Sequence, residues 1–138
     1  MRIIWGPVGT FVKKLGASEF GRDVLSYIGK VVGYIIVEGG LFGVKKVQGK
    51  EKYARLIASE WFKVLDVFGC KYEKSKMKRD EVEVRMLEYP AGLRRGDEKI
   101  CEAGMWADRT IIKRLGGNLI IGKTIASGAN KCYQKIRI

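Results

Sequence analysis

Strict alternation of apolar and polar residues in two segments of the second half constrains the fold more than any other feature. In the segment 80–89, one face carries Val82, Val84 and Met86, and the other carries charged side chains. In the segment 131–138, the two faces are Cys132, Gln134, Ile136 and Ile138 on one side and Tyr133, Lys135 and Arg137 on the other. A period of two indicates a strand with one buried face. The chain therefore has to build a sheet that is apolar on one side only.

Each alternating segment has a neighbour that can pair with it. The run Lys71–Arg79 can form a hairpin with the segment 80–89, turning near Arg79 and Asp80. This hairpin would create two favourable cross-strand pairs, Lys78 with Glu81 and Lys76 with Glu83. A strand over Asn118–Ala126 and a turn at 127–130 lead into the last strand. Four antiparallel strands are expected.

The rest of the chain has helical periodicity. Ser18 can cap a helix that runs from about Glu19 towards Gln48 and is kinked or broken at Gly39-Gly40. A second helix is expected over Lys50–Phe68, and a third from about Asp97 to Leu115, ended by Gly116 and Gly117. The order α-α-(α)-β-β-α-β-β predicts an α+β fold in a single domain, 1–138, with the helices packed on one face of a small four-stranded antiparallel sheet.

The composition removes several kinds of chemistry. The sequence contains no histidine, which excludes Ser-His-Asp and Cys-His catalysis and histidine metal ligands. The three cysteines are far apart, an arrangement that favours a reducing, cytoplasmic setting over a secreted disulfide scaffold. The formal charge of +12 favours an anionic partner. No signal peptide is visible, and the most apolar stretch, Val24–Val44, is too interrupted by charges and glycines for a transmembrane segment.

One segment imitates a nucleotide-binding motif. Gly117–Thr124 matches the P-loop pattern G-x-x-x-x-G-K-[ST] letter for letter. A functional P-loop follows a strand and opens a helix, whereas here a helix is expected before Gly117 and strand residues after it. No acidic residue follows Asp108 that could hold magnesium. We therefore interpret Lys123 and Thr124 as strand residues on opposite faces.

Glycines and aromatic residues mark the helices. Gly29 and Gly33 are four residues apart, as are Gly39 and Gly43; this spacing favours close helix packing, within the domain or across a homodimer, and also leaves room for a ligand. Aromatic residues at helical spacing fill a core or line an apolar pocket between helices and sheet, and the sequence leaves both open. The candidate ligand-binding aromatics are Tyr27, Tyr34, Trp61, Phe68 and Trp106.

Two alternatives concern other chemistry. Cys101 is expected in the first turn of the third helix, where the positive helix end favours a thiolate, and it is the best candidate nucleophile. It is also a typical buried cysteine. The basic face of the last strand, with Tyr133, Lys135 and Arg137, could contact nucleic acid or be solvated.

The element order and two stretches resemble a superfamily of small ligand-binding domains. It comprises the 4-vinyl-reductase domain, found in hydrocarbon-sensing regulators and in bacteriochlorophyll synthesis, and the TRAPP vesicle-tethering subunits. Ser26–Gly39 looks like its glycine-spaced early helix, and Ile100–Ile138 looks like its late helix and closing hairpin. The tail is also similar to the amino-thiazoline-carboxylate hydrolase family, through Lys123–Gly128 and Cys132, with Cys101 in the place of that family's helix cysteine.

The resemblance implies a domain that binds a small apolar ligand or dimerises, with Cys132 added to the candidate ligand-binding residues. The hydrolase resemblance implies, as an alternative, action on a small cyclic amide or thiazoline through Cys101. Zinc-containing 4-vinyl-reductase domains carry further ligands between two outer cysteines, but the corresponding positions here are Ile121 and Thr124. Structural zinc requires four ligands. We therefore expect no metal and no other cofactor.

Overall fold

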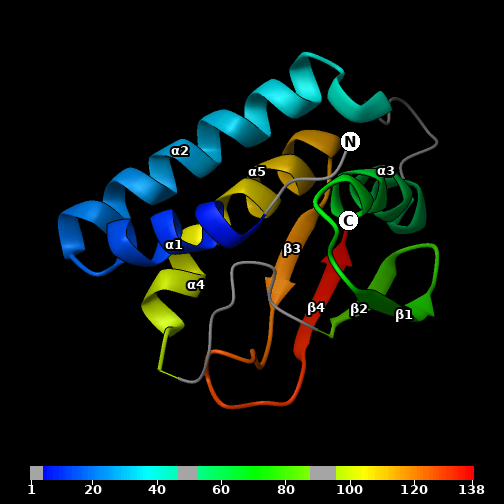
Figure 1. Ribbon diagram of the computed structural model, residues 1–138. Helices are drawn as coiled ribbons and strands as arrows, with labels where there is room; N and C mark the ends of the chain where they lie inside the picture. Colours follow the sequence, from blue (N-terminus) through cyan, green and yellow to red (C-terminus); the bar gives the residue numbers. More distant parts are fainter. Residues whose placement is uncertain (1–4, 47–52, 88–95) are drawn as a thin grey trace.

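The computed structural model describes residues 5–46, 53–87 and 96–138 (Figure 1). Its helices are α1 (Trp5–Gly16), α2 (Glu19–Glu38), the 3-10 turn η1 (Leu41–Gly43), α3 (Ala54–Val67), α4 (Glu98–Gly104) and α5 (Trp106–Leu115). Its strands are β1 (Tyr72–Met77), β2 (Glu81–Met86), β3 (Asn118–Ile121) and β4 (Cys132–Arg137). This arrangement confirms the expected α+β class and the order of the strands along the chain.

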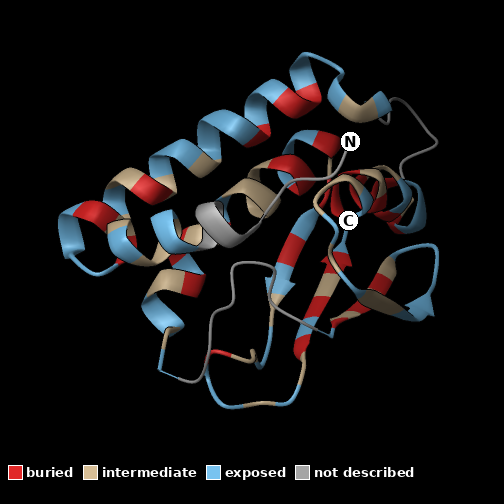
Figure 2. Cartoon of the chain, viewed as in Figure 1, coloured by how far each residue is buried: buried red, intermediate tan, exposed pale blue. Residues whose placement is uncertain are grey.

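The four strands form one antiparallel sheet in the order β1-β2-β4-β3. The alternation of β2 and β4 is confirmed: every second side chain is buried beneath the helices, and the intervening ones are half-buried or exposed (Figure 2). Lys76 pairs with Glu83 in the β1–β2 register, as expected. Lys78 lies in the turn, where its backbone N–H donates to the carbonyl of Glu81.

The glycines of α2 set how closely it packs on α5. A Cβ atom at Gly33 would lie 2.8 Å from the carbonyl oxygen of Ala107, and one at Gly29 would lie 2.9 Å from the backbone nitrogen of the same residue. Such distances require the neighbouring backbone to move, so only glycine fits these two positions. The expectation of close helix packing is therefore confirmed for Gly29 and Gly33, whereas a Cβ at Gly43 would meet nothing within 4 Å, so the second glycine pair does not serve it.

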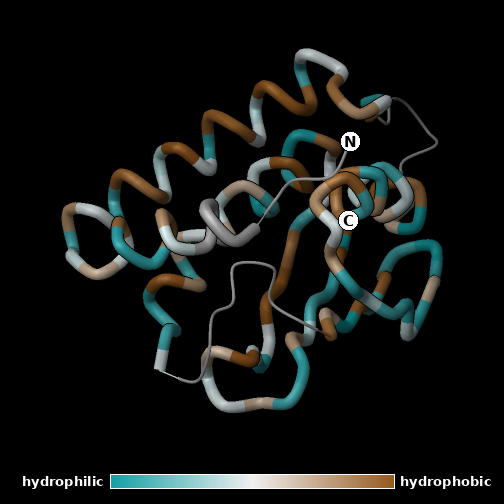
Figure 3. The backbone as a smooth tube through the Cα atoms, in the orientation of Figure 1, coloured by the Kyte–Doolittle hydropathy of each residue, from teal (hydrophilic) through white to brown (hydrophobic). Residues whose placement is uncertain are grey.

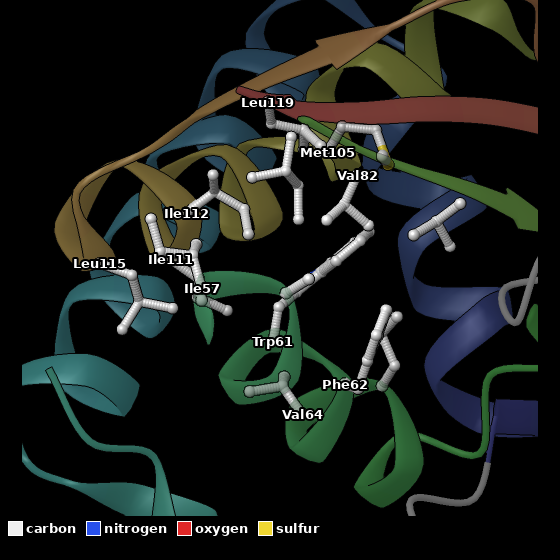
Figure 4. Packing of buried hydrophobic residues seen from close by; sticks show 14 of the residues in the cluster. Ile57, Trp61, Phe62, Val64, Val82, Met105, Ile111, Ile112, Leu115 and Leu119 are labelled. Atoms are coloured by element: carbon white, nitrogen blue, oxygen red, sulfur yellow. The ribbon is translucent and has the colours of Figure 1, made fainter. Parts of the chain in front are cut away.

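The core lies between the sheet and the helices α3 and α5. Trp61 of α3 is fully buried, and Figure 4 shows its ring extending towards Val82 of the sheet. Ile57 from α3 and Ile111 from α5 complete this layer and are also fully buried. Full burial of a large side chain contributes about 2 kcal/mol or more, and it fixes α3 and α5 against the same part of the sheet.

The helix boundaries agree with the prediction in part. The expected break at Gly39-Gly40 is confirmed, because α2 ends at Glu38 and only η1 follows before Val44; Lys50–Lys52 of the second helix lie outside the described residues. The third helix is divided into α4 and α5 at Gly104-Met105, where glycine is a weak helix former. Gly116 ends α5 in the left-handed conformation, with φ 104°.

The predicted strand over Asn118–Ala126 is too long, because β3 ends at Ile121. Thr124 and Ser127 then form a turn with two reciprocal bonds: the Thr124 N–H donates to Ser127 Oγ at 3.0 Å, and the Ser127 N–H donates to Thr124 Oγ1 at 3.1 Å. Lys123 and Thr124 are therefore turn residues, and the expectation that they lie in a strand was wrong. The P-loop match precedes no helix, because this turn leads into β4.

None of the helices in the described part of the chain combines the length and the apolar character that crossing a membrane requires.

Candidate functional site

A cavity of about 130 Å³, partly open to solvent, lies between the helices and the buried face of the sheet. Its wall combines residues of α2, α3, α4, α5, β2 and β4 with those of two connections. The lining residues are Val32, Ile36, Val64, Leu65, Phe68, Cys70, Met86, Gly104, Met105, Ala107, Asp108, Ile111, Cys132 and Gln134. Most of this wall is apolar, as in sites for small organic molecules.

Asp108 places a carboxyl group in this apolar wall. Trp61 Nε1 donates a hydrogen bond of 2.9 Å to Asp108 Oδ1. Burial raises the pKa of Asp108 from 3.8 to about 6, because a low-dielectric surrounding disfavours the charged form; the Trp61 bond acts in the opposite direction but is the smaller effect. The carboxyl group is therefore mostly ionised at neutral pH, although its ionised form is less stable here than it would be in water.

Gln134 contributes a second polar group from β4. Its side chain is only 3% exposed, and its Oε1 atom is buried without a hydrogen-bond partner among the described residues. Its Nε2 atom lies 3.9 Å from Met105 Sδ, a weak contact that holds the amide beside the break between α4 and α5. A buried carbonyl oxygen without a partner costs about 1–3 kcal/mol. Such an atom in a cavity wall is therefore a position where a bound donor gains stability.

Two thiols complete the polar part of the wall. Burial, assisted by the nearby charges of Asp108 and Asp66, raises the pKa of Cys70 to about 12. Burial also raises the pKa of Cys132, whose Sγ accepts a hydrogen bond of 3.3 Å from the Ile125 N–H. Both thiols are therefore neutral near pH 7, so they act as small, weakly polar wall groups rather than nucleophiles.

The structure brings together some of the sequence-predicted residues at this cavity. Phe68 and Cys132 line it, and Trp61 lies behind it, bonded to Asp108. Cys101 is buried on α4 and is not a lining residue. None of the three cysteines, all of which lie in the described residues, forms a disulfide.

Three other predicted aromatics lie outside the cavity. Tyr27 and Tyr34 are 69% and 47% exposed on the outer face of α2, and Trp106 is 37% exposed at the start of α5. Lys30 Nζ lies 4.3 Å from the centre of the Trp106 ring, and the Arg114 guanidinium lies 4.4 Å from the centre of the Tyr34 ring. These rings therefore shape the surface where α2 meets α5 and not the cavity wall.

Sequence reasoning missed Asp108 and Gln134, although both carry a signal. Asp108 precedes Ile111 by three residues and Ile112 by four, so it lies on the apolar face of its helix. Gln134 lies between Cys132 and Ile136 on the apolar face of an alternating strand. A polar residue within an apolar stripe must find a partner when it is buried, which makes it a candidate for ligand binding.

The opposite face of the sheet carries a network of ion pairs. Three glutamates, Glu73, Glu81 and Glu83, lie among five basic side chains, Lys76, Arg85, Lys131, Lys135 and Arg137. The shortest pairs, Lys131 with Glu73 and Arg137 with Glu81, are both 2.9 Å long. The hydrogen bonds from Lys131 and Arg137 lower the pKa of Glu73 and Glu81 respectively. The expected basic face is thus partly neutralised.

No group of three or more cysteine, aspartate or glutamate side chains in the described residues is placed to hold a metal ion. The chain matches no family model, and no curated protein is similar to it.

Proposed function

We propose that the chain binds a small, mostly apolar molecule in the cavity between α2, α3, α5 and the sheet. The observation that carries this proposal is a buried, unpartnered Gln134 Oε1 in the wall of a partly open apolar cavity. Buried polar atoms normally have a partner, and Gln134, as a lining residue, lies where a ligand or an ordered water can supply one. The cytoplasmic location expected from the cysteine pattern belongs to the same proposal.

The cavity volume limits the size of the ligand. A cavity of about 150 Å³ holds a benzene molecule, and the volume here is about 130 Å³. The part of the ligand that is enclosed therefore has roughly six non-hydrogen atoms. Val32 is the one lining residue in the described part of the chain that is exposed, at 36%, so a longer molecule would extend past it towards solvent.

The proposal concerns binding without a catalytic step. The thiols on the wall, Cys70 and Cys132, have raised pKa values and are poor nucleophiles at neutral pH. Cys101, the nucleophile of the hydrolase alternative, does not line the cavity.

Native mass spectrometry of the purified protein, with organic extraction of what co-purifies, tests the binding proposal. A defined small molecule at fixed stoichiometry is expected, and Val32→Phe at the cavity mouth should lower its occupancy. Ile28→Phe is the control, because Ile28 is 39% exposed on the same helix but is not a lining residue. Equal occupancy in both variants would contradict the assignment of the ligand to this cavity.

A specific observation on α2 favours a second function, self-association. Its outer face carries exposed large apolar side chains, and Figure 3 shows hydrophobic segments along the length of this helix. Four exposed residues and the half-buried Val24 are spaced alternately by four and three, as in a coiled-coil seam: Phe20, Val24, Tyr27, Val31 and Tyr34. The inward face of α2 is already used by Gly29 and Gly33 against α5.

We propose a second copy of the chain as the partner of this seam, because a twofold axis would pack the seam against itself. Sedimentation velocity tests this proposal: the wild type should dimerise, and Val31→Glu should be monomeric. Leu56→Glu is the control, because Leu56 is similarly exposed, at 38%, but lies on α3. A dimer that survives Val31→Glu, or a wild type that remains monomeric at every concentration, would contradict the seam.

A further inference from the structure

Two side chains of the cavity wall carry acceptor oxygens, Gln134 and Asp108. Gln134 Oε1 is buried and has no donor among the described residues, and the Asp108 carboxyl group receives one hydrogen bond, from Trp61. Both side chains line the same cavity of about 130 Å³, so one benzene-sized molecule can contact both parts of the wall. A ligand that pairs with these two oxygens supplies hydrogen-bond donors.

The wall also carries an uncompensated negative charge. No lysine or arginine is among the lining residues in the described part of the chain. A carboxylate in a low-dielectric surrounding gains far more from a nearby cation than it would in water. An anionic ligand would be repelled by Asp108 and would leave Gln134 Oε1 without a donor.

We propose that the preferred ligand is a small primary amine with an apolar body, bound as the ammonium ion with its N–H groups directed at Asp108 and Gln134. This inference rests on the proposed function of the cavity and specifies the class of ligand. An ammonium group has three donors and no acceptor, which suits a wall with two acceptor groups and one negative charge. An alcohol supplies one donor and no charge, and a hydrocarbon or ketone supplies no donor.

The test compares three probes of the same size, each with six non-hydrogen atoms: cyclopentylamine, cyclopentanol and cyclopentanone. Isothermal titration at neutral pH is expected to rank their affinities in that order. The amine should bind roughly tenfold or more tightly than the ketone, because leaving a buried acceptor unpaired costs about 1–3 kcal/mol and each 1.4 kcal/mol is a factor of ten.

Two nearly isosteric variants test whether Asp108 and Gln134 cause the preference for the amine. Asp108→Asn keeps the shape of the side chain and an oxygen that can accept from Trp61, and it should abolish the preference for the amine over the alcohol. Gln134→Met removes the unpartnered oxygen, and it should reduce the preference of both donors over the ketone. Near-ultraviolet circular dichroism of the tryptophans verifies that each variant is folded.

The outcomes separate this inference from the function on which it rests. Equal affinity for all three probes, or tightest binding of the ketone, would overturn the amine assignment and leave a general apolar binding site. Binding of none of the three would overturn the cavity as a ligand site and the amine assignment with it. An amine preference that persists in Asp108→Asn and Gln134→Met would also overturn the inference, because the cation would then bind elsewhere.

Discussion

Trp61 Nε1 on α3 donates a hydrogen bond of 2.9 Å to Asp108 Oδ1 on α5, across 47 residues of sequence. The bond joins the most buried large side chain of the core to the carboxyl group of the cavity wall. It stabilises the ionised form of Asp108 against the opposing effect of burial. The bond therefore links the core tryptophan directly to a polar group of the cavity wall.

Trp61→Phe should lower the free energy of unfolding by about 2–4 kcal/mol, because it removes both ring volume and the donor to a buried carboxylate. The pKa of Asp108, measured by NMR titration of its carboxyl carbon, should rise further above 6, because the Trp61 bond lowers it in the wild type. Trp106→Phe is the control and should cost less than about 1 kcal/mol, since Trp106 is 37% exposed. Equal losses in urea denaturation would contradict the role given to the bond.

Asp108 should also make stability depend on pH. Its pKa is about 6 in the folded chain against an ordinary 3.8, so between these values the folded state binds a proton that the unfolded state has lost. Stability from this group is therefore greatest below about pH 4 and falls as the pH rises through 6, by about 3 kcal/mol in total.

Comparison of the wild type with Asp108→Asn isolates this effect. The glutamates with lowered pKa values, Glu38, Glu73 and Glu81, act in the opposite direction at lower pH, but they are common to both proteins. The other titratable groups on the cavity wall, Cys70 and Cys132, have raised pKa values and stay neutral over this range. Chemical denaturation at pH 4 and pH 7 should show the wild type losing stability relative to the variant; parallel behaviour would count against a buried, ionising Asp108.

Gly33→Ala should destabilise the fold by about 1–3 kcal/mol, although alanine favours a helix by about 1 kcal/mol. The new Cβ would lie 2.8 Å from the Ala107 carbonyl oxygen and 2.9 Å from Thr110 Cβ, so α2 and α5 would have to separate. Ser59→Ala, at an exposed position of α3, is the control for helix propensity and should change stability by no more than about 0.5 kcal/mol. A stabilised Gly33→Ala protein in thermal denaturation would refute the close contact.

The ion pairs of the outer sheet face should limit its affinity for polyanions. The double variant Glu81→Gln/Glu83→Gln releases Lys135 and Arg137 from their partners, and it should elute from heparin at higher salt than the wild type. The control Glu98→Gln/Glu102→Gln changes the net charge equally but on α4, outside the sheet. If both variants shift to the same extent, net charge alone governs retention and the outer face has no special role.

The periodic patterns predicted the fold because burial follows them directly. In β2 and β4, every second residue had to face the helices, and the structure places them so. Boundaries were less predictable where particular side chains decide them. The Thr124 and Ser127 hydroxyl groups accept backbone hydrogen bonds that fold the connection between β3 and β4 into a turn. The residues before Thr124 favour a strand, so their sequence did not indicate this turn.

The candidate site was only partly predictable. Helical spacing predicted Tyr27, Tyr34 and Trp61 alike as ligand-binding residues. Because α2 has apolar residues on both faces, spacing alone does not identify which face of the helix points inward. The deciding feature is steric: Gly29 and Gly33 permit close approach to α5, and the aromatic residues consequently face outward. The sequence indicates Asp108 and Gln134 as site residues only if a polar residue within an apolar stripe is taken as evidence for a binding site.

NMR of the methyl-labelled protein during titration with cyclopentylamine shows whether the cavity is the ligand site. Methyl resonances of the lining residues Ile36, Val64 and Ile111 should shift together and saturate. Those of Ile57 and Ile136, which are fully buried but do not line the cavity, should stay nearly unchanged. Shifts confined to Ile28 and Val31 on the exposed face of α2, or no saturable shift at any methyl group, would contradict the cavity as the ligand site.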